Sequence, residues 1–464
     1  MSFPRYPKYK DSGVEWLGQV PEHWTSIRYK NVFQEKEFTS GWTLPSGAIS
    51  FGRVVFKNDE ALNEETKATY QEVLSGEFLI NPINLNYDLK SLRTAHSQIN
   101  TCVSPAYIVL KPKIDLAGNY FKFQLHMFDL RHMKTLGAGV RQTITFADIG
   151  SCFTQMPPLP EQNRIAAFLE QETAKIDALV AEQERLMELL KEKRQSVISH
   201  AVTKGLNRKA ALKPSGIEWL GDVPAHWKVG KCGFYISILS GFAFPSTGFT
   251  DDENDTKLLR GINVGVQQLK WDETVYWRRV EGDGLDIYEM KAGDLVIGMD
   301  RPLISEGIRV AKVKESDLPC LLLQRVASLK IGKLLNADFL LGLLSSEMFV
   351  AHFSPDTTGV SVPHISPEQI NNFVIPVPPI SEQQEITSFI NAEAARFDTL
   401  TAEAQRAIDL LQERRTALIS AAVTGQIDVR GVAHANPENH LVGTDEMVPQ
   451  PRKSLPHEQR NHTF

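Results

Sequence analysis

Two long stretches of the chain carry apolar residues three or four positions apart, which is the pattern of an amphipathic helix. The first runs from Glu161 to about Thr203 without proline or glycine, and the second, within residues 378–428, repeats its pattern. Prolines stand just before each stretch, as is typical of a helix start. Because such a helix has no core of its own, it most simply buries its apolar stripe on a matching helix, here the other copy. The expected interface positions are Ile165, Leu169, Ile176, Leu179, Leu186, Leu190, Val197, Ile386, Ile390, Phe397, Leu400, Leu411 and Leu418.

The segments that precede these helices have shorter and mixed patterns. Short apolar runs predict buried strands at residues 78–80, 107–110, 295–297 and 321–323. Residues 338–350, with a counterpart at 119–133, predict an amphipathic helix. The predicted fold class is therefore α+β, with two similar mixed α/β globular domains, each followed by a long helix.

Two pairs of repeated segments indicate an internal duplication. Residues 12–24 recur at 215–227 with ten of thirteen positions identical, and residues 157–203 recur at 378–424 with 22 of 47 identical. The predicted parts are two globular domains, two helical segments and a tail that we expect to be disordered. Their bounds are 1–156 and 206–377 for the domains, 157–205 and 378–428 for the helices, and 429–464 for the tail.

Composition narrows the class of protein. The chain has 42% hydrophobic and 23% charged residues, as an ordinary globular protein does. We expect no secretory signal and no membrane helix, since no apolar run approaches about 20 residues. The four cysteines are too far apart for a zinc knuckle or a dense disulfide scaffold, so a reducing cytoplasm is expected. The net charge of −6 does not mark a strongly basic nucleic-acid binder, so any DNA contact must come from local patches or from a partner.

Catalytic signatures are missing from the sequence. There is no G-x-x-x-x-G-K-[ST] phosphate loop, and no H-E-x-x-H, G-x-S-x-G or S-x-x-K motif. Asn81 and Pro82 form only a fragment of the Asn-Pro-Pro-aromatic motif of amino-group DNA methyltransferases, and a turn is the better interpretation. His23 and His226 each precede a tryptophan and are interpreted as packing beside it. We predict no catalytic, metal or cofactor-binding residue in this chain.

The repeated motifs resemble those of a known family. The Gly-(Val/Ile)-Glu-Trp-Leu-Gly-x-Val-Pro-x-His-Trp segments, the Pro-Pro-x-x-Glu-Gln-x-x-Ile helix entries and the Ala-Val-Thr helix ends resemble the specificity subunits of type I restriction-modification systems. The resemblance covers nearly all of residues 1–430. It implies two target recognition domains, each reading one half of a split sequence in double-stranded DNA, and two helices that pack as an antiparallel coiled coil.

The resemblance also implies where the chemistry takes place. Specificity subunits are not catalytic themselves. They recruit two modification subunits, which transfer methyl groups from S-adenosylmethionine to adenines, and in the full complex two ATP-driven restriction subunits. S-adenosylmethionine, ATP and magnesium are therefore expected to bind to partners rather than to this chain.

Candidate DNA contacts are polar residues on expected loops. Arginine suits guanine and asparagine or glutamine suits adenine, while further arginines hold phosphates. For any single residue, a solvated or salt-bridged surface remains an equal alternative. A shared DNA role for Arg141 is doubtful, because the matching loop of the second copy lacks an arginine. The candidates are Arg53, Lys90, Arg93, Lys111, Arg131, Arg141, Arg260, Asn263, Arg278, Arg279, Arg301, Gln324 and Arg325.

Two other classes of function stay open from the sequence. An enzyme with its own methyltransferase or nuclease site would show methyl transfer or cleavage by the purified chain alone. A coiled-coil scaffold with no DNA role would show no sequence-dependent DNA binding when the modification subunit is present.

Overall fold

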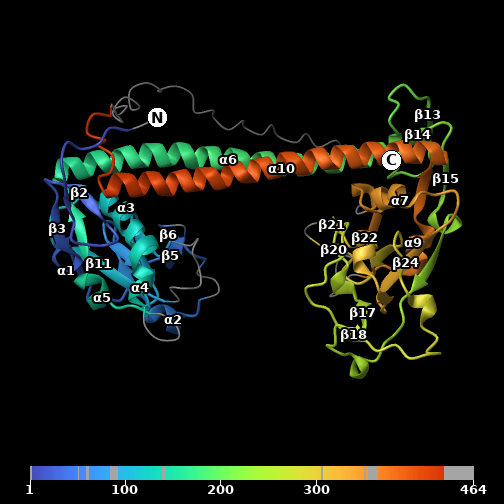
Figure 1. Cartoon of the computed structure of the whole chain (residues 1–464), viewed down its shortest axis with the longest axis horizontal. Coiled ribbons are helices and arrows are strands. Elements are labelled where there is room, and N and C mark those ends of the chain that lie inside the picture. The colour runs from blue at the N-terminus through green and yellow to red at the C-terminus, as the bar shows by residue number, and fades with distance from the viewer. Residues whose placement is uncertain are drawn as a thin grey trace, which may run out of the picture. The chain divides into compact units, whose positions relative to one another are not determined.

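Figure 1 shows the computed structural model of the chain, which describes residues 3–50, 52–58, 62–83, 92–137, 143–304, 307–349, 352–353 and 364–432. The chain forms two compact units. Unit 1 comprises Met1–Leu179 and Leu410–Phe464, and unit 2 comprises Val180–Asp409. The division falls inside both long helices, whereas the sequence predicted helical segments separate from the globular domains. Each unit therefore contains one globular domain together with a part of each helix.

Unit 1 is built on a six-stranded sheet with the strand order β4–β11–β8–β9–β6–β5. Neighbouring strands are antiparallel, except for β6 and β9, which are parallel. Helix α3 (Gly118–Phe128) packs on this sheet, where Phe121 meets Phe33 edge-on with ring centroids 5.5 Å apart. The strand bounds are β4 Phe33–Glu35, β5 Gly47–Ser50, β6 Arg53–Phe56, β8 Phe78–Ile80, β9 Thr94–His96 and β11 Ile108–Pro112.

Short elements complete the globular part of unit 1. Three antiparallel pairs are β1 with β2, β3 with β12, and β7 with β10. Their bounds are β1 Tyr9–Asp11, β2 Gln19–Pro21, β3 Thr25–Arg28, β7 Gln71–Val73, β10 Thr101–Val103 and β12 Phe153–Met156. The short helices are α1 Tyr29–Val32, α2 Glu64–Ala68, the π-helical turn Asp129–Met133, α4 Lys134–Leu136 and α5 Phe146–Ser151.

Unit 2 contains an antiparallel sheet with the order β16–β24–β19–β22 and a second sheet with the order β18–β17–β23. In the second sheet, β17 and β23 are parallel. The bounds are β16 Ile236–Ser240, β17 Thr256–Leu259, β18 Tyr276–Trp277, β19 Leu295–Gly298, β22 Val310–Lys312, β23 Cys320–Leu322 and β24 Val326–Ile331. Three pairs and two helices complete the unit: β13 Leu212–Pro214 with β14 Asp222–Pro224, β15 Lys228–Lys231 with β25 Val374–Val377, β20 Leu303–Ile304 with β21 Gly307–Ile308, α7 Ala337–Leu344 and α9 Pro367–Asn372.

The two units share a pattern of pairing. Strand β11 lies between β4 and β8 in unit 1 as β24 lies between β16 and β19 in unit 2. Likewise β3 pairs with β12 as β15 pairs with β25, and a helix (α3 or α7) follows the central strand. This shared pairing reproduces the duplication predicted from the repeated segments. The predicted helix at 338–350 is interrupted: α7 ends at Leu344, a turn follows at residues 345–346, and helix resumes at 347–349.

The two predicted long helices are present as α6 (Leu159–Lys204) and α10 (Ile380–Val423). Each ends at a glycine with a left-handed backbone, Gly205 with φ 73° and Gly425 with φ 72°. A residue in this conformation satisfies the last carbonyls of a helix, and glycine adopts it without steric cost. No helix within the described residues is both long enough and apolar enough to cross a membrane.

Burial along the helices corrects part of the predicted stripe. Leu179, Leu186 and Leu400 are 46%, 42% and 37% exposed, whereas the other ten predicted positions are buried or half-buried. The less exposed positions alternate in steps of three and four, as in a heptad repeat. On α6 they are Ile176, Val180, Gln183, Met187, Leu190, Arg194, Val197 and Ala201, and on α10 they are Ile390, Ala394, Phe397, Thr401, Ala404, Ile408, Leu411, Arg415, Leu418 and Ala422. We call these positions the seam.

The chain that follows α10 packs against the start of unit 1. The backbone N–H of Asp428 donates to the carbonyl of Pro4 at 2.7 Å, and the guanidinium of Arg430 lies 4.7 Å from the ring centroid of Tyr6. Val429, the first residue of the predicted disordered tail, is fully buried. The folded part of unit 1 therefore extends at least to Val432, and residues 433–464 lie outside the described residues.

Candidate nucleic-acid interface

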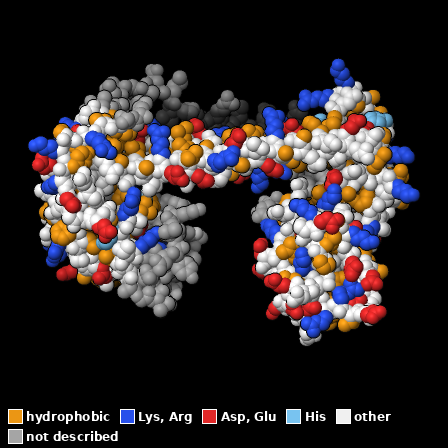
Figure 2. Space-filling view, viewed as in Figure 1, with side chains coloured by type: hydrophobic (Ala, Val, Ile, Leu, Met, Phe, Trp, Pro, Cys, Tyr) orange, Lys and Arg blue, Asp and Glu red, His pale blue; other side chains and the backbone are white. Residues whose placement is uncertain are grey.

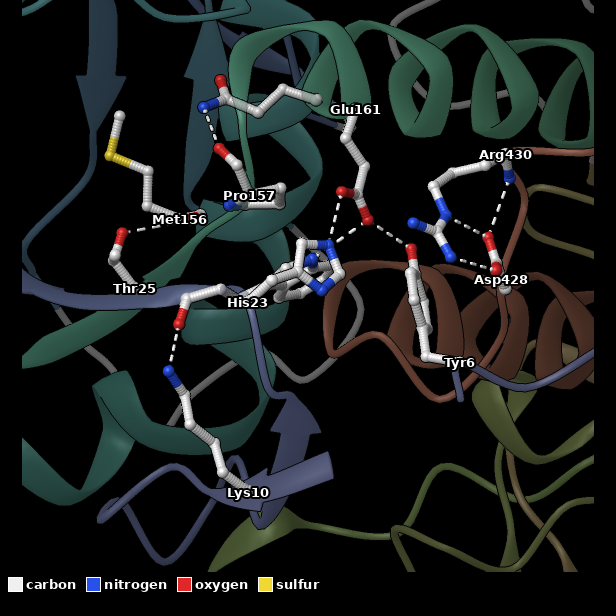
Figure 3. A network of polar contacts seen from close by, with 11 residues as sticks. Tyr6, Lys10, His23, Thr25, Met156, Pro157, Glu161, Asp428 and Arg430 are labelled. Atoms are coloured by element: carbon white, nitrogen blue, oxygen red, sulfur yellow. Dashed lines mark hydrogen bonds and ion pairs between the residues drawn. The ribbon is translucent and has the colours of Figure 1, made fainter. Parts of the chain in front are cut away.

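The repeated motifs meet at the start of each long helix. In unit 1, Glu161 in the first turn of α6 is buried and accepts hydrogen bonds from the Tyr6 hydroxyl at 2.6 Å and the Trp24 indole N–H at 3.0 Å (Figure 3). Its second oxygen lies 2.8 Å from Nε2 of His23. Burial, and then the hydrogen bond to Glu161, raise the pKa of Tyr6 well above its ordinary value, so the phenol keeps its proton and donates it.

The glutamine of the same motif joins α6 to the domain. The backbone N–H of Ala117, just before α3, donates to Oε1 of Gln162 at 3.0 Å, and Nε2 of Gln162 donates to the carbonyl of Pro157 at 2.9 Å. Gln162 is fully buried. The Glu-Gln pair thus fixes the first turn of α6 against both the amino-terminal segment and α3.

Unit 2 repeats this junction with fewer contacts. Oε2 of Glu382 lies 2.7 Å from His226, and the side chain of Gln383 accepts from the N–H of Asn336 at 2.7 Å. Trp227 is buried, but its indole N–H has no hydrogen-bond partner among the described residues. Lys209 stands where the repeat places the counterpart of Tyr6. The histidines and the buried tryptophans therefore support the domain edge, as the sequence predicted. Glu161 is the partner of His23 and Trp24, and Glu382 is the partner of His226.

The residues of unit 2 that suit a DNA ligand gather at one open cavity of about 710 Å³. Four predicted candidates line it, namely Arg260, Arg301, Gln324 and Arg325. Arg309, which the sequence analysis missed, also lines it, as do the aromatic rings of Phe244 and Phe249. We call this the arginine cavity. Its four guanidinium groups face a single carboxylate among the lining residues, that of Asp300.

The backbone at this cavity is unusual. Among the described residues other than glycine, Arg301 (φ 44°), Arg325 (φ 71°) and Gln267 (φ 58°) have left-handed backbones, and the two arginines both line the cavity. This conformation costs on the order of 1 kcal/mol or more for a residue with a Cβ atom, and such strain clusters at functional sites. The strain supports a ligand-contacting role for Arg301 and Arg325.

Neighbouring groups orient the guanidiniums. Asp300 accepts from Nη1 of Arg325 at 2.9 and 3.0 Å and lies 2.8 Å from Nδ1 of His364. Arg309 donates through Nε to the carbonyl of Val264 at 2.9 Å, and its burial, followed by the charge of Arg301, lowers its pKa. The buried Nε of Arg260 makes no hydrogen bond within the described part of the chain.

The chemistry of the arginine cavity matches base edges and phosphates. Arginine donates two parallel hydrogen bonds to guanine, and glutamine does the same with adenine while also accepting from it. Gln324 and Arg325 are exposed at adjacent positions, so both can reach one ligand. Elsewhere on the face seen in Figure 2, basic and acidic side chains are interspersed, in keeping with the net charge of −6.

The remaining candidates of unit 2 have other partners. Asn263 is 1% exposed and its amide donates to the carbonyls of Lys270 and Glu273, so it fixes a loop and does not face solvent. Arg279 pairs with three carboxylates, and Arg278 lies 3.4 and 3.8 Å from two others. The partners of Arg279 are Asp283, Asp286 and Glu289, and those of Arg278 are Asp255 and Asp252. These acidic neighbours largely neutralise both arginines.

The candidates of unit 1 are scattered over the described residues. Arg53 and Arg131 are exposed, and Nζ of Lys111 lies 3.8 Å from Glu77. Arg93 is 6% exposed and donates to the carbonyl of Ile83, which places its side chain inside the domain and away from DNA. Lys90 and Arg141 lie outside the described residues.

Two exposed aromatic residues lie close together in one loop of unit 1. Phe38 and Trp42 are each 61% exposed in the loop that follows β4. The matching loop of unit 2, which follows β16, contributes Phe244 and Phe249 to the arginine cavity. The sequence analysis missed this pair, although two large aromatic residues in a largely polar run were a usable signal.

Comparison with known proteins gives consistent matches. The family model described as the type I restriction modification DNA specificity domain matches residues 94–188 and 277–408. The type I restriction enzyme MjaVIII specificity subunit of Methanocaldococcus jannaschii is 28% identical over 281 residues, which are 60% of this chain and 62% of that protein. The type I restriction enzyme EcoAI specificity subunit of Escherichia coli is 34% identical over 168 residues, 36% of this chain and 28% of that protein. The matches thus span less than two thirds of these relatives.

A solved structure shares the fold. A chain from a study of complex assembly and conformational transition in the type I R-M system superposes with a TM-score of 0.64 at 16% identity. The match covers 87% of this chain and 98% of that chain. The likeness therefore extends over both units.

Proposed function

We propose that this chain is a member of the type I restriction modification DNA specificity family, whose model matches a region in each unit, and that it recognises duplex DNA in two parts, one with each unit. The arginine cavity of unit 2 is the observation that carries the proposal. It combines exposed hydrogen-bonding groups suited to guanine and adenine with an excess of positive charge, in a chain whose net charge is −6. The loop with Phe38 and Trp42 is the proposed counterpart in unit 1. Since the two surfaces differ in chemistry, the two parts of the target differ in sequence.

In this proposal the chain itself is not catalytic. Two modification subunits methylate adenine with S-adenosylmethionine, and two restriction subunits cleave DNA with ATP and magnesium. Support comes from the lack of catalytic motifs in the sequence and from the names of the relatives, which are specificity subunits.

We further propose that α6 and α10 form an antiparallel pair that spaces the two reading surfaces. In unit 1, Arg415 near the end of α10 donates to Asp177 of α6 at 3.0 Å. In unit 2, Arg194 of α6 donates to Asp398 of α10 at 2.5 Å. The number of residues from Asp177 forward to Arg194 on α6 equals the number from Arg415 back to Asp398 on α10. One antiparallel register accounts for both ion pairs.

Methylome mapping tests two-part reading. The chain is combined with modification subunits, and N6-methyladenine is mapped by long-read sequencing with and without it. We expect methylation of a split motif that depends on the chain. Replacing residues 25–150 with the equivalent region of another family member should then change one half of the motif only.

Three results would contradict the proposal. A change in both halves would show that the units do not read independently. Methyl transfer or cleavage by the purified chain with DNA, S-adenosylmethionine, ATP and magnesium would identify an enzyme. A lack of sequence-dependent DNA binding in the presence of the modification subunit would indicate that the chain is a coiled-coil scaffold without a role in DNA recognition.

A further inference from the structure

A second cavity in unit 1 is lined by residues from the start of β6, from α3 and from the two long helices. Figure 1 shows α3 beneath the long helices in this unit. Its volume is about 260 Å³. Arg53 at the start of β6, Lys122 and His126 of α3, and Arg415 of α10 all line it. Four nitrogen-bearing side chains from three elements thus converge on one space, although the sequence analysis singled out only Arg53.

Two polar side chains at this cavity make no hydrogen bond with the described residues. The Thr94 side chain is 3% exposed, and its hydroxyl has no partner in the described part of the chain. His126 is 7% exposed, and no described residue forms a hydrogen bond with its imidazole. The great majority of buried polar groups in proteins are hydrogen-bonded, so the Thr94 hydroxyl and the His126 imidazole are free to bond to a ligand in this cavity. A hydroxyl and a neutral imidazole can each donate one hydrogen bond into the cavity.

The charges around the cavity determine what kind of occupant fits. Arg53 and Lys122 form no ion pair with described residues, and Arg415 is paired with Asp177. Glu170 and Asp177 of α6 also line the space, so three permanent cations face two carboxylates. Burial first, and then Arg415 and Lys122, lower the pKa of His126 to about 4. Burial also lowers the pKa of Lys122, and Arg53 and Arg415 add to that effect against the opposing pull of Glu170 and Asp177.

We propose that this cavity binds an oxyanion of the phosphate class. Such a group accepts several hydrogen bonds at once, and Arg53, Lys122, Thr94 and His126 can all donate. A cation is disfavoured by the three permanent positive charges, and the described residues contain no cluster of three potential metal ligands. The space exceeds that of one phosphate group, so the phosphate can be free or part of a DNA backbone that passes the exposed Arg53.

Inorganic phosphate with the full-length chain tests the site directly. The imidazole of His126 is followed by NMR with labelled histidine and assigned by its loss in His126→Gln. Bound phosphate stabilises the imidazolium, so millimolar phosphate should raise the pKa of His126, whereas chloride at equal ionic strength should not. Arg53→Gln and Lys122→Gln should each weaken phosphate binding about tenfold, because each removes a charge-assisted hydrogen bond. Arg164→Gln, an exposed site on α6 away from the cavity, is the matched control.

Duplex DNA distinguishes the two sources of phosphate. If a backbone phosphate enters the cavity, Arg53→Gln and Lys122→Gln should each reduce the slope of log affinity against log salt by about 1. If only free phosphate binds, the salt slope stays the same while the phosphate effect on His126 remains. Either result supports the site.

A pKa of His126 that does not respond to phosphate in the unmodified chain, together with an unchanged salt slope in both variants, would overturn the proposal. The phosphate measurement is made on the unmodified chain without DNA, and His126→Gln serves only to assign the signal. Its failure would therefore leave the proposed recognition function untouched, since that function is tested at the arginine cavity of unit 2.

Discussion

The carboxylate of Asp300 holds the guanidinium of Arg325 through two contacts of 2.9 and 3.0 Å. Asp300 is a paired acidic residue in a cavity otherwise rich in positive charge, and Arg325 has a left-handed backbone at φ 71°. The pair therefore presents the remaining guanidinium donors of Arg325 in a fixed direction. This arrangement leads to the first prediction.

Arg325→Ala should weaken recognition of one half of the DNA target by about tenfold or more, because a bidentate base contact contributes roughly 1–3 kcal/mol of discrimination. Asp300→Ala should relax the sequence preference at the same half, since Arg325 loses its fixed direction. Methylation rates on matched and mismatched duplexes, with modification subunits present, measure both effects. Arg279→Gln is the control, because the guanidinium of Arg279 is already ion-paired with three carboxylates. An equal loss in this control would argue against a specific role for Arg325.

Glu161→Ala should destabilise the chain more than Glu382→Ala. Removing Glu161 leaves the buried donors of Tyr6 and Trp24 unsatisfied, at a cost of about 3 kcal/mol. Glu382 has one side-chain partner, the half-exposed His226, so its loss should cost about 1 kcal/mol. Urea unfolding measures the difference, and Glu161→Gln, which keeps one acceptor oxygen, should fall between the two. Equal losses in the free energy of unfolding would show that the two junctions contribute equally to stability.

The stability of unit 1 should depend on pH through His126. Its pKa is about 4 in the folded chain, whereas a histidine in the unfolded chain titrates near 6.5. Between these values the unfolded state binds the proton and the folded state does not, so the free energy of unfolding falls as the pH drops. The full effect is on the order of 3 kcal/mol.

Urea unfolding of the unmodified chain and of His126→Gln, from about pH 7 down to about pH 4, tests this dependence. The glutamine variant should lose less stability over this range. Parallel curves for the two proteins would show that His126 does not carry the acid sensitivity.

Seven residues inserted into both long helices should lengthen the gap between the two halves of the DNA target. Insertions after Glu184 in α6 and after Ala407 in α10 are matched by the register of the Arg194–Asp398 pair and keep the heptad phase. The added helix is about 10 Å long, which corresponds to about three base pairs. Methylome mapping should show a longer spacer with the same half-sites.

An insertion in α6 alone is the control for this experiment. It displaces the seam positions of α6 that follow Glu184 relative to their partners on α10. This mismatch should abolish methylation by the complex. An active double variant with an unchanged spacer would show that the helices do not set the distance.

The sequence predicted the two helices and the duplication well, because both depend on local patterns. Leu179, Leu186 and Leu400 were placed in the interface by the three- and four-residue spacing of apolar positions, but all three are exposed. In each case the residue one position later, Val180, Met187 or Thr401, is the less exposed one. Spacing alone therefore does not decide between a step of three and a step of four.

The candidate contacts were harder to predict because most of their roles depend on how the chain folds around them. The burial of Arg93 is one example. Arg279 is an exception, because its three carboxylate partners lie only four, seven and ten residues later and were visible in the sequence. Arg309 was missed because it joins Arg301 and Arg325 only through the fold. Motif repetition identified Trp24 and Glu161 separately, but only the structure showed that they are hydrogen-bonded to each other.

Unit 1 is assembled from the two ends of the described chain, whereas unit 2 is one continuous stretch. During synthesis, residues 3–179 therefore leave the ribosome without Ile419, Val423 and Val429, which belong to their core. Unit 2 has all of its residues as soon as Asp409 has emerged. Because domains fold as their residues become available, the part made first should be the last to reach its final packing. Until then it exposes apolar surface that a chaperone would be expected to cover.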